Sequence, residues 1–214
     1  AGDAGGLTGG LLGCGAVAGA FYVFVGLAQV LTREGFDLRR HPLSLLSNGD
    51  LGWVQIGNFL VSGILVIAGA IGLRQALRGS RGGTWAPVLL AGYGVGLMGA
   101  GLFVADPGAG FPPGTPPQST SMTRSGLLHF VFGGIGFYAL IAAALVLARR
   151  FWTLQQAAWA MYSVITGVGF LVSFAAIASG STSPAILLAF YAAVAWVWAW
   201  HTAVYLKVRR GLAR

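Results

Sequence analysis

The sequence predicts an all-α, polytopic integral membrane protein, a single domain over residues 1–214 built as a bundle of six transmembrane helices. The first observation behind this class is composition: 56% of the 214 residues are hydrophobic, only 8% are charged, and the mean hydropathy is +0.77. A soluble domain carries about 25% charged residues, so lipid must be the solvent for most of this surface. The second observation is that six apolar stretches reach the roughly 20 residues that cross the hydrocarbon core.

Clear breaks separate the six predicted spans. The first span is expected to be retained in the membrane, because no basic segment and cleavage site mark it as a signal peptide. Two long loops follow the first and third spans, over residues 32–52 and 106–125, and the second loop holds five prolines that prevent a continuous helix. The remaining breaks are short and basic or rich in glycine and serine. The predicted spans cover residues 11–31, 53–73, 87–105, 126–148, 157–178 and 184–206.

The positions of the basic residues predict the orientation. The short loops and the C-terminus on one side of the spans carry nine of them, and the two long loops on the other side carry four. Cytoplasmic segments hold the excess of Lys and Arg, so both termini are predicted to be cytoplasmic and the long loops non-cytoplasmic. The nine residues are Arg74, Arg78, Arg81, Arg149, Arg150, Lys207, Arg209, Arg210 and Arg214.

The apolar stretches also carry packing and interface signals. Gly15 with Gly19, and Gly92 with Gly96, have the small-xxx-small spacing that lets helix backbones approach. Trp53 and a second group of tryptophans, at 196, 198 and 200, are expected at the membrane interfaces. His201 follows that second group and is expected to be an interfacial residue, separate from the other histidines.

Polar residues gather toward the predicted outer side. The first long loop contains Asp37, Arg39, Arg40, His41 and Ser44, and the second contains Asp106 and Arg124. Gln55, Asn58 and Ser62 follow at i, i+3 and i+7, which places them on one helical stripe. His129 shares a face with Gly133 and Gly136 and is expected to point into the bundle, where an unpartnered polar group is costly.

Three interpretations of these residues remain open. In the structural one, Asp37, Asp50 and Asp106 pair with Arg39, Arg40 and Arg124 and fix the loops onto the bundle. In the binding one, the loops and upper bundle line a pocket that binds, senses or passes a small amphipathic or anionic ligand, such as a lipid headgroup. Its candidate residues are Asp37, Arg39, Arg40, His41, Ser44, Gln55, Asn58, Asp106, Arg124 and His129.

The third interpretation is a membrane-embedded hydrolase or transferase that uses histidine and aspartate, with or without a metal. His41, His129 and Asp106 are weak metal candidates because they are spread over two loops and one span. Ser44 and Ser47 lack a nucleophile-elbow pattern beside His41. The sequence identifies no cofactor.

The expected partners are membrane lipids and a lipid or other small-molecule ligand. The net charge of +8 does not indicate nucleic-acid binding, because the basic residues lie at the ends of apolar runs. A larger membrane complex, with this chain as an accessory subunit, or a homo-oligomer is a further alternative. Twelve arginines against one lysine, with abundant glycine and alanine, indicate a bacterial genome, so a bacterial plasma membrane is expected.

Four motifs are distributed along the chain. The first motif is Gly35-Phe36-Asp37-Leu38-Arg39-Arg40-His41-Pro42-Leu43-Ser44-Leu45-Leu46-Ser47. The others are Gly52-Trp53-Val54-Gln55-Ile56-Gly57-Asn58-Phe59, Phe103-Val104-Ala105-Asp106-Pro107 and Gly126-Leu127-Leu128-His129-Phe130. Together they resemble a bacterial domain-of-unknown-function family, number 998, of multi-span membrane proteins. The resemblance covers nearly the whole chain and implies a multi-span membrane protein, but it implies no activity.

Overall fold

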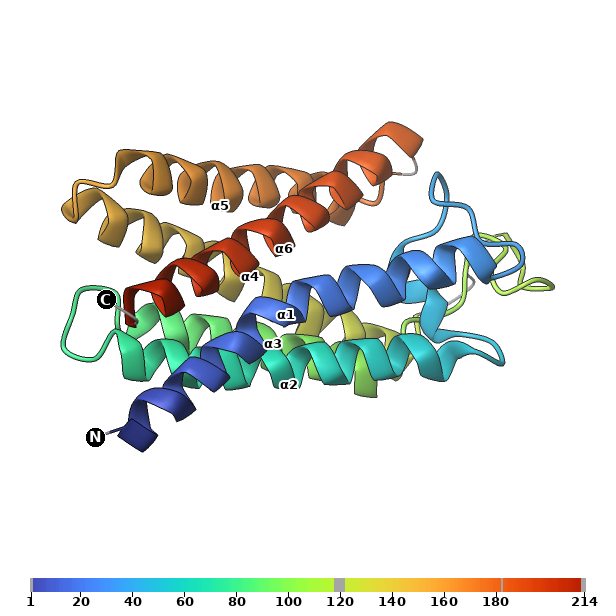
Figure 1. Ribbon diagram of the computed structural model, residues 1–214. Coiled ribbons are helices and arrows are strands. Elements are labelled where there is room, and N and C mark those ends of the chain that lie inside the picture. The colour runs from blue at the N-terminus through green and yellow to red at the C-terminus, as the bar shows by residue number, and fades with distance from the viewer. Residues whose placement is uncertain (1, 118–121, 182, 213–214) are drawn as a thin grey trace.

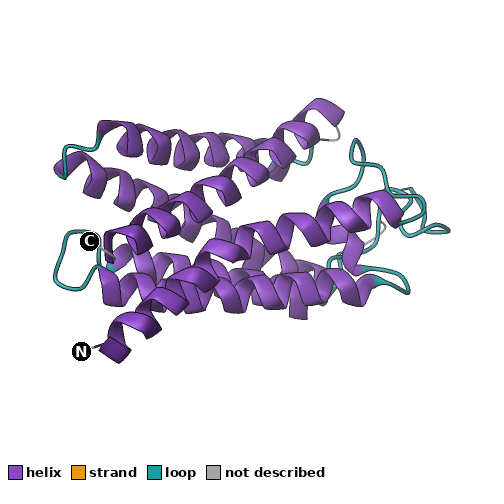
Figure 2. Ribbon diagram, in the orientation of Figure 1, coloured by secondary structure: helices purple, strands orange, loops and turns teal. Residues whose placement is uncertain are grey.

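A computed structural model describes residues 2–117, 122–181 and 183–212, which form six long helices and no strand (Figures 1 and 2). Each of these six helices is long and apolar enough to cross a membrane, which confirms the predicted class for the described chain. The short 3₁₀ helix η1 (Leu43–Ser47) lies within the first long loop. The long helices are α1 (Gly2–Thr32), α2 (Gly52–Ala76), α3 (Trp85–Leu102), α4 (Arg124–Thr153), α5 (Ala157–Ala178) and α6 (Pro184–Leu212).

Most helices extend past the predicted apolar stretches. The stretches mark only the residues that must lie in hydrocarbon, whereas the helical backbone continues into the interface, as α4 does to Thr153 and α6 to Leu212. Two helices differ: α5 coincides with its predicted stretch, and α3 ends at Leu102, three residues before the predicted end. The extended backbone that follows from Phe103 leads into the second long loop.

The helices form a closed ring in chain order. Each packs on the next, and α6 packs on α1. Both termini lie at one end of the bundle, here called the terminal end, and the two long loops lie at the opposite end, here called the loop end (Figure 1). The cytoplasmic position of the terminal end stays a prediction.

Glycines set the closest helix crossings. A Cβ atom on Gly96 would lie 2.6 Å from the Cα atom of Gly136, so α3 and α4 touch there through their backbones. A Cβ atom on Gly15 would lie 2.5 Å from the Tyr205 ring, and one on Gly19 would lie 3.0 Å from the Trp198 carbonyl oxygen. The predicted packing role of these three glycines is confirmed. A Cβ on Gly92, by contrast, would make an ordinary contact.

The outer surface of the bundle is apolar, as a lipid-facing surface must be. Trp53 at the start of α2, Trp85 at the start of α3 and Trp152 near the end of α4 are 68%, 67% and 62% exposed. They lie near the two ends of the bundle, consistent with aromatic belts. The interfacial assignment of Trp198 and Trp200 is wrong, because both are buried. Trp198 packs against Tyr22 of α1, and Trp200 donates to Ser163 of α5 on another side of α6.

Candidate functional site

His41 joins the two long loops. Its side chain is buried, Nδ1 accepts the N–H of Asp37 at 2.9 Å, and Nε2 lies 3.0 Å from the carbonyl oxygen of Ala109. Since a carbonyl can only accept, Nε2 carries the proton. The ring also packs against Phe36 and Phe111, with centroids 5.4 and 5.6 Å away. Both nitrogens are occupied, so His41 has no free nitrogen to act as a base toward Ser44, whose side chain is half-buried.

The loop that contains His41 is fixed to the bundle at two points. The hydroxyl of Tyr191 on α6 donates to the carbonyl oxygen of His41. The guanidinium of Arg33 donates to the carbonyls of Leu46 (3.0 Å) and Asn48 and lies 5.3 Å from the centre of the Phe111 ring. Desolvation lowers the pKa of Arg33, while Asp50 opposes this shift. Sequence analysis did not identify these anchoring roles of Arg33 and Tyr191.

Arg39 and Arg40 lie on the exposed side of the same loop. Arg39 Nε is 3.3 Å from a carboxylate oxygen of Asp37, and the Arg39 side chain is 70% exposed. The backbone N–H of Arg39, followed by the guanidinium, holds the pKa of Asp37 below its usual range. Arg40 makes one long hydrogen bond to Ala109, at 3.4 Å. Of the pairs in the structural interpretation, only Asp37–Arg39 forms among the described residues, and it lies within one loop rather than fixing that loop to the bundle. The four arginines of the two long loops are balanced by four carboxylates, so Arg39 and Arg40 form a local basic group and not a net positive loop end.

Asp106 begins α4 rather than pairing with an arginine. One carboxylate oxygen of Asp106 accepts the backbone N–H of Thr123 at 2.8 Å, and the other accepts the Thr123 hydroxyl. The same hydroxyl oxygen accepts the backbone N–H of Gly126. A carboxylate satisfies exposed N–H groups at a helix N-terminus and complements its dipole. A Cβ at position 126 would lie 2.1 Å from Asp106 Oδ2, so any larger residue there would displace this carboxylate. Arg124 is exposed and makes no ion pair in the described part of the chain.

His129 faces the bundle interior, as predicted, and closes the end of α3. Its Nδ1 lies 2.9 Å from each of the carbonyl oxygens of Ala100 and Phe103, so it carries a proton and donates. His41 and His129 share no hydrogen-bond or ring-contact partner within the described ranges. There, no group of three or more His, Cys, Asp or Glu side chains could hold a metal ion. Among the described residues, His41, His129 and Asp106 therefore do not come together as a metal-ligand set.

The α2 stripe is completely buried and extends to α1. Gln55 and Asn58 are 0% and 1% exposed, and Asn58 Nδ2 lies 3.2 Å from both Gln55 Oε1 and the Tyr22 carbonyl oxygen. The Nε2 of Gln29 on α1 donates to Gln55 Oε1 at 2.7 Å. Ser62 continues the stripe with a 3.4 Å contact to Asn58. Sequence analysis missed Gln29, although Gly15, Gly19, Tyr22, Gly26 and Gln29 have alternating spacings of four and three residues, which place them on one face of α1.

Three buried polar side chains lie on the inner face of α6. Trp198, His201 and Tyr205 are 2%, 1% and 1% exposed, so the expected interfacial position of His201 is wrong. The His201 ring centroid lies 5.4 Å from that of Trp198 and 4.6 Å from that of Tyr205. The Gly15 backbone approaches the His201 ring closely enough for a weak hydrogen bond. The indole N–H, the imidazole nitrogens and the phenol oxygen make no hydrogen bond of normal geometry to the residues that the structure describes. Their i, i+3 and i+7 spacing was the available signal.

An apolar groove of about 560 Å³ lies between α5 and α6. Residues 165–176 of α5 and 186–196 of α6 contribute its walls, and Val172 and Trp196 on its edges are 65% and 48% exposed. The groove is therefore open to the surroundings of the bundle. Ser173 is one of its few polar residues, and the Ser173 hydroxyl has no hydrogen-bond partner over residues 2–117, 122–181 and 183–212.

Comparison with known proteins identifies the family. The family model described as "Protein of unknown function (DUF998)" matches residues 16–207. The match covers most of the chain, so the chain belongs to this family and the predicted resemblance is confirmed. No curated protein and no solved structure matches the chain. The chain is thus a multi-pass, membrane-type helical protein of a family without an assigned activity.

Proposed function

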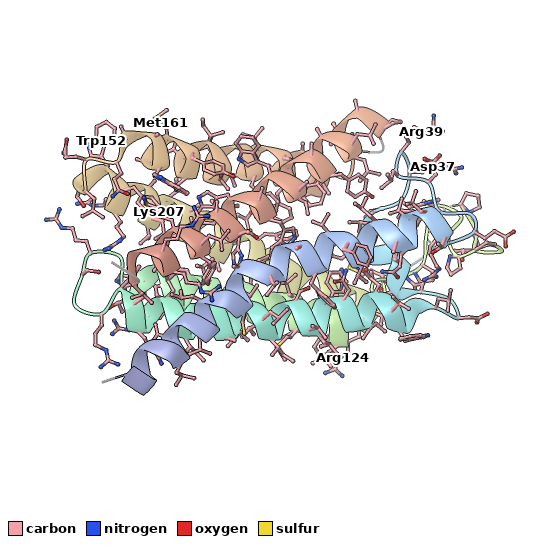
Figure 3. The ribbon with its side chains drawn as sticks, in the orientation of Figure 1. Asp37, Arg39, Arg124, Trp152, Met161 and Lys207 are labelled. Atoms are coloured by element: carbon pink, nitrogen blue, oxygen red, sulfur yellow. The ribbon has the colours of Figure 1, made fainter. Side chains whose placement is uncertain are left out.

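We propose that this protein binds an anionic phospholipid at the loop end. An acyl chain of the lipid occupies the α5–α6 groove, and the phosphate of its headgroup contacts Arg39 and Arg40. The observation that carries this proposal is the open apolar groove on α6, the helix that also holds the loop with Arg39 and Arg40. Tyr191 of α6 holds the carbonyl of His41, the residue that follows the two arginines. Figure 3 places Arg39 at the same end of the bundle as the start of α6.

The dimensions of the groove suit an acyl chain. Its α5 wall runs over residues 165–176, a rise of about 16 Å at 1.5 Å per residue. One leaflet contributes about half of the roughly 30 Å hydrocarbon core. A volume of about 560 Å³ is also within the usual range of small-molecule sites. Ser173 supplies a hydroxyl that an ester group of the lipid can engage.

The local pair of exposed guanidinium groups, Arg39 and Arg40, favours an anionic headgroup. Asp37 offsets part of the charge of Arg39, and Arg40 has a carbonyl as its hydrogen-bond partner. Exposed guanidinium groups bind phosphate through paired hydrogen bonds. We place the loop end on the non-cytoplasmic side of a bacterial plasma membrane, on the support of the uneven distribution of basic residues between the two ends.

The first experiment tests the contribution of charge, by native mass spectrometry of the full chain in mild detergent. Phosphatidylglycerol and phosphatidylcholine of identical acyl chains are added separately. We expect phosphatidylglycerol to be retained more strongly, and Arg39→Gln or Arg40→Gln to weaken its binding about fivefold each, since a basic residue near an anionic lipid contributes about 1 kcal/mol. Arg124→Gln is the matched control. Equal retention of the two lipids, or an equal loss in the control, would refute the proposal.

The second experiment tests the groove with the same mass spectrometry. Gly169→Leu fills the groove at a glycine whose Cβ position has no neighbour within 4 Å. Both lipids should bind several-fold more weakly, because the acyl chain is common to them. Gly133→Leu, at an equally open glycine of α4, is the control and should have no effect. Unchanged lipid retention in Gly169→Leu would place the acyl chain elsewhere.

A further inference from the structure

A chain of buried polar side chains crosses the bundle away from the proposed lipid groove. Its loop-end half is the α1–α2 pair of Gln29 and Gln55, followed by Asn58. Its terminal-end half is the row of Trp198, His201 and Tyr205 on α6. Tyr22 joins the two halves: its carbonyl accepts from Asn58, and its ring centroid lies 5.0 Å from that of Trp198. These seven residues are called the polar seam.

The seam contains a set of polar atoms without hydrogen-bond partners. Besides the four atoms of the α6 row, Gln29 Oε1 and Gln55 Nε2 make no hydrogen bond to the described chain, although both residues are at least nine-tenths buried. Burying such groups without partners is costly. By contrast, Ser163 and Thr166, buried between α5 and α6, bond the indole N–H groups of Trp200 and Trp196. Most of the unpartnered buried polar atoms in the described chain therefore lie in the seam. A small polar molecule bound there would supply the hydrogen bonds that these atoms lack.

We propose that the polar seam holds a file of water molecules that relays protons between the two ends of the bundle, with His201 as the internal proton carrier. Water can both donate to the unpartnered acceptors and accept from the unpartnered N–H and O–H groups. The seven side chains of the seam come from α1, α2 and α6, so the file of water molecules would run where these three helices meet. Ionisable residues inside membrane bundles commonly mark proton paths.

His201 is the one seam residue that can exchange protons at both sides of its ring. One ring nitrogen accepts a proton from a water molecule on one side, while the N–H of the other nitrogen releases its proton to a water molecule on the other side. Rotation of the ring about its Cβ–Cγ bond then returns the N–H to its starting side, so one proton has crossed and atoms and charge balance. The tyrosines and Trp198 hold the neighbouring waters through hydrogen bonds and keep their own protons.

Few titratable groups face this path in the described structure. Arg209, whose guanidinium lies 3.9 Å from the Cβ position of Gly13, marks the terminal end, and Arg33 lies at the loop end. Tyr162 of α5 faces Trp196 instead of the seam.

On α1, Tyr22 faces the seam and Cys14 neighbours Gly15. From α3, Tyr93 reaches Trp198, with ring centroids 5.6 Å apart. On α6 itself, Tyr205 contacts His201, and α2 contributes no titratable side chain to the buried stripe.

The test measures proton flux in vesicles of phosphatidylcholine and phosphatidylglycerol that contain the full-length chain and a trapped pH-sensitive dye. A potassium gradient with valinomycin sets the membrane potential. We expect protein-dependent flux in the wild type, and a loss of at least about tenfold in His201→Phe and His201→Gln. The glutamine variant keeps hydrogen-bonding groups but cannot carry the proton, which separates a relay from a packing role.

Gln55→Leu interrupts the seam on another helix and should also remove most of the flux. Ser163→Ala, a buried polar residue outside the seam, is the control and should leave the flux unchanged. Flux no greater than in protein-free vesicles, a flux that His201→Gln retains, or a loss in only one half of the seam would overturn the proposal. None of these outcomes depends on lipid retention, so the lipid-binding proposal is tested separately.

Discussion

Replacing Gly96 with alanine should force α3 away from α4 and destabilise the bundle. The added Cβ would lie 2.6 Å from the Cα of Gly136 and 2.8 Å from the carbonyl oxygen of Phe132. Carbon atoms in contact prefer separations of about 3.5–4.0 Å, so the two backbones must move apart by about 1 Å. Overpacking of this kind typically costs about 1–3 kcal/mol. Because the obstacle is backbone rather than a flexible side chain, rotamer changes cannot relieve it.

The matched control for this prediction is Gly134→Ala on α4, where the added Cβ has no neighbour within 4 Å. Both variants replace a helical glycine, so the gain in helix propensity is common to them. Equilibrium unfolding of the full chain in mixed micelles, with increasing SDS, gives the free energy of unfolding of each. We expect Gly96→Ala to be about 1–3 kcal/mol less stable than Gly134→Ala. Equal stability would show that α3 and α4 do not cross at Gly96 and Gly136.

Three further predictions concern the buried stripe and the loops. Gln55→Leu removes the acceptor of the Gln29 amide and should cost about 1–2 kcal/mol, measured by the same SDS unfolding; no change would show that the amide contact contributes nothing. Asp106→Ala removes the acceptor of the Thr123 N–H and should destabilise the start of α4 by about 1 kcal/mol, seen as faster hydrogen exchange of its first-turn amides, whereas unchanged exchange would contradict the cap. The depressed pKa of Asp37 predicts that its carboxyl carbon, followed by carbon-13 NMR, titrates below the usual pKa of about 3.9. The ionised Asp37 carboxylate stabilises the loop at pH values above about 3.9, and this stabilisation is lost as the pH falls through the depressed pKa. A titration midpoint at or above the usual pKa would contradict the contact with the Arg39 backbone.

The bundle was predictable because each span must satisfy its own backbone in lipid. A stretch of apolar residues long enough to cross the membrane is then a helix, whatever its neighbours are. The loop between residues 32 and 52 follows no such rule. Its 3₁₀ helix at Leu43–Ser47 depends on contacts with Arg33, at the start of the same loop, and with Phe111 of the second long loop. The end of α3 was likewise set by the His129 side chain of α4, which bonds the last carbonyls.

The candidate site was predictable only in part. The i, i+3 and i+7 spacing placed Gln55, Asn58 and Ser62 on one stripe, and the structure buries all three. His201 was assigned to an interface because it lies near the end of an apolar stretch. Its burial depends on the glycines of α1 that let α6 approach, which is a property of two helices rather than of one sequence segment.

The acyl-chain position in the α5–α6 groove is tested most directly by photo-crosslinking in lipid nanodiscs. A phosphatidylglycerol with a diazirine in its acyl chain is activated, and the labelled residues are identified by mass spectrometry. The proposed site predicts labels concentrated on groove residues such as Gly169, Val172 and Ala193, and fewer of them in Arg39→Gln. Labels spread evenly over lipid-facing residues of other helices, such as Phe24 of α1 and Val95 of α3, would contradict a lipid site in this groove.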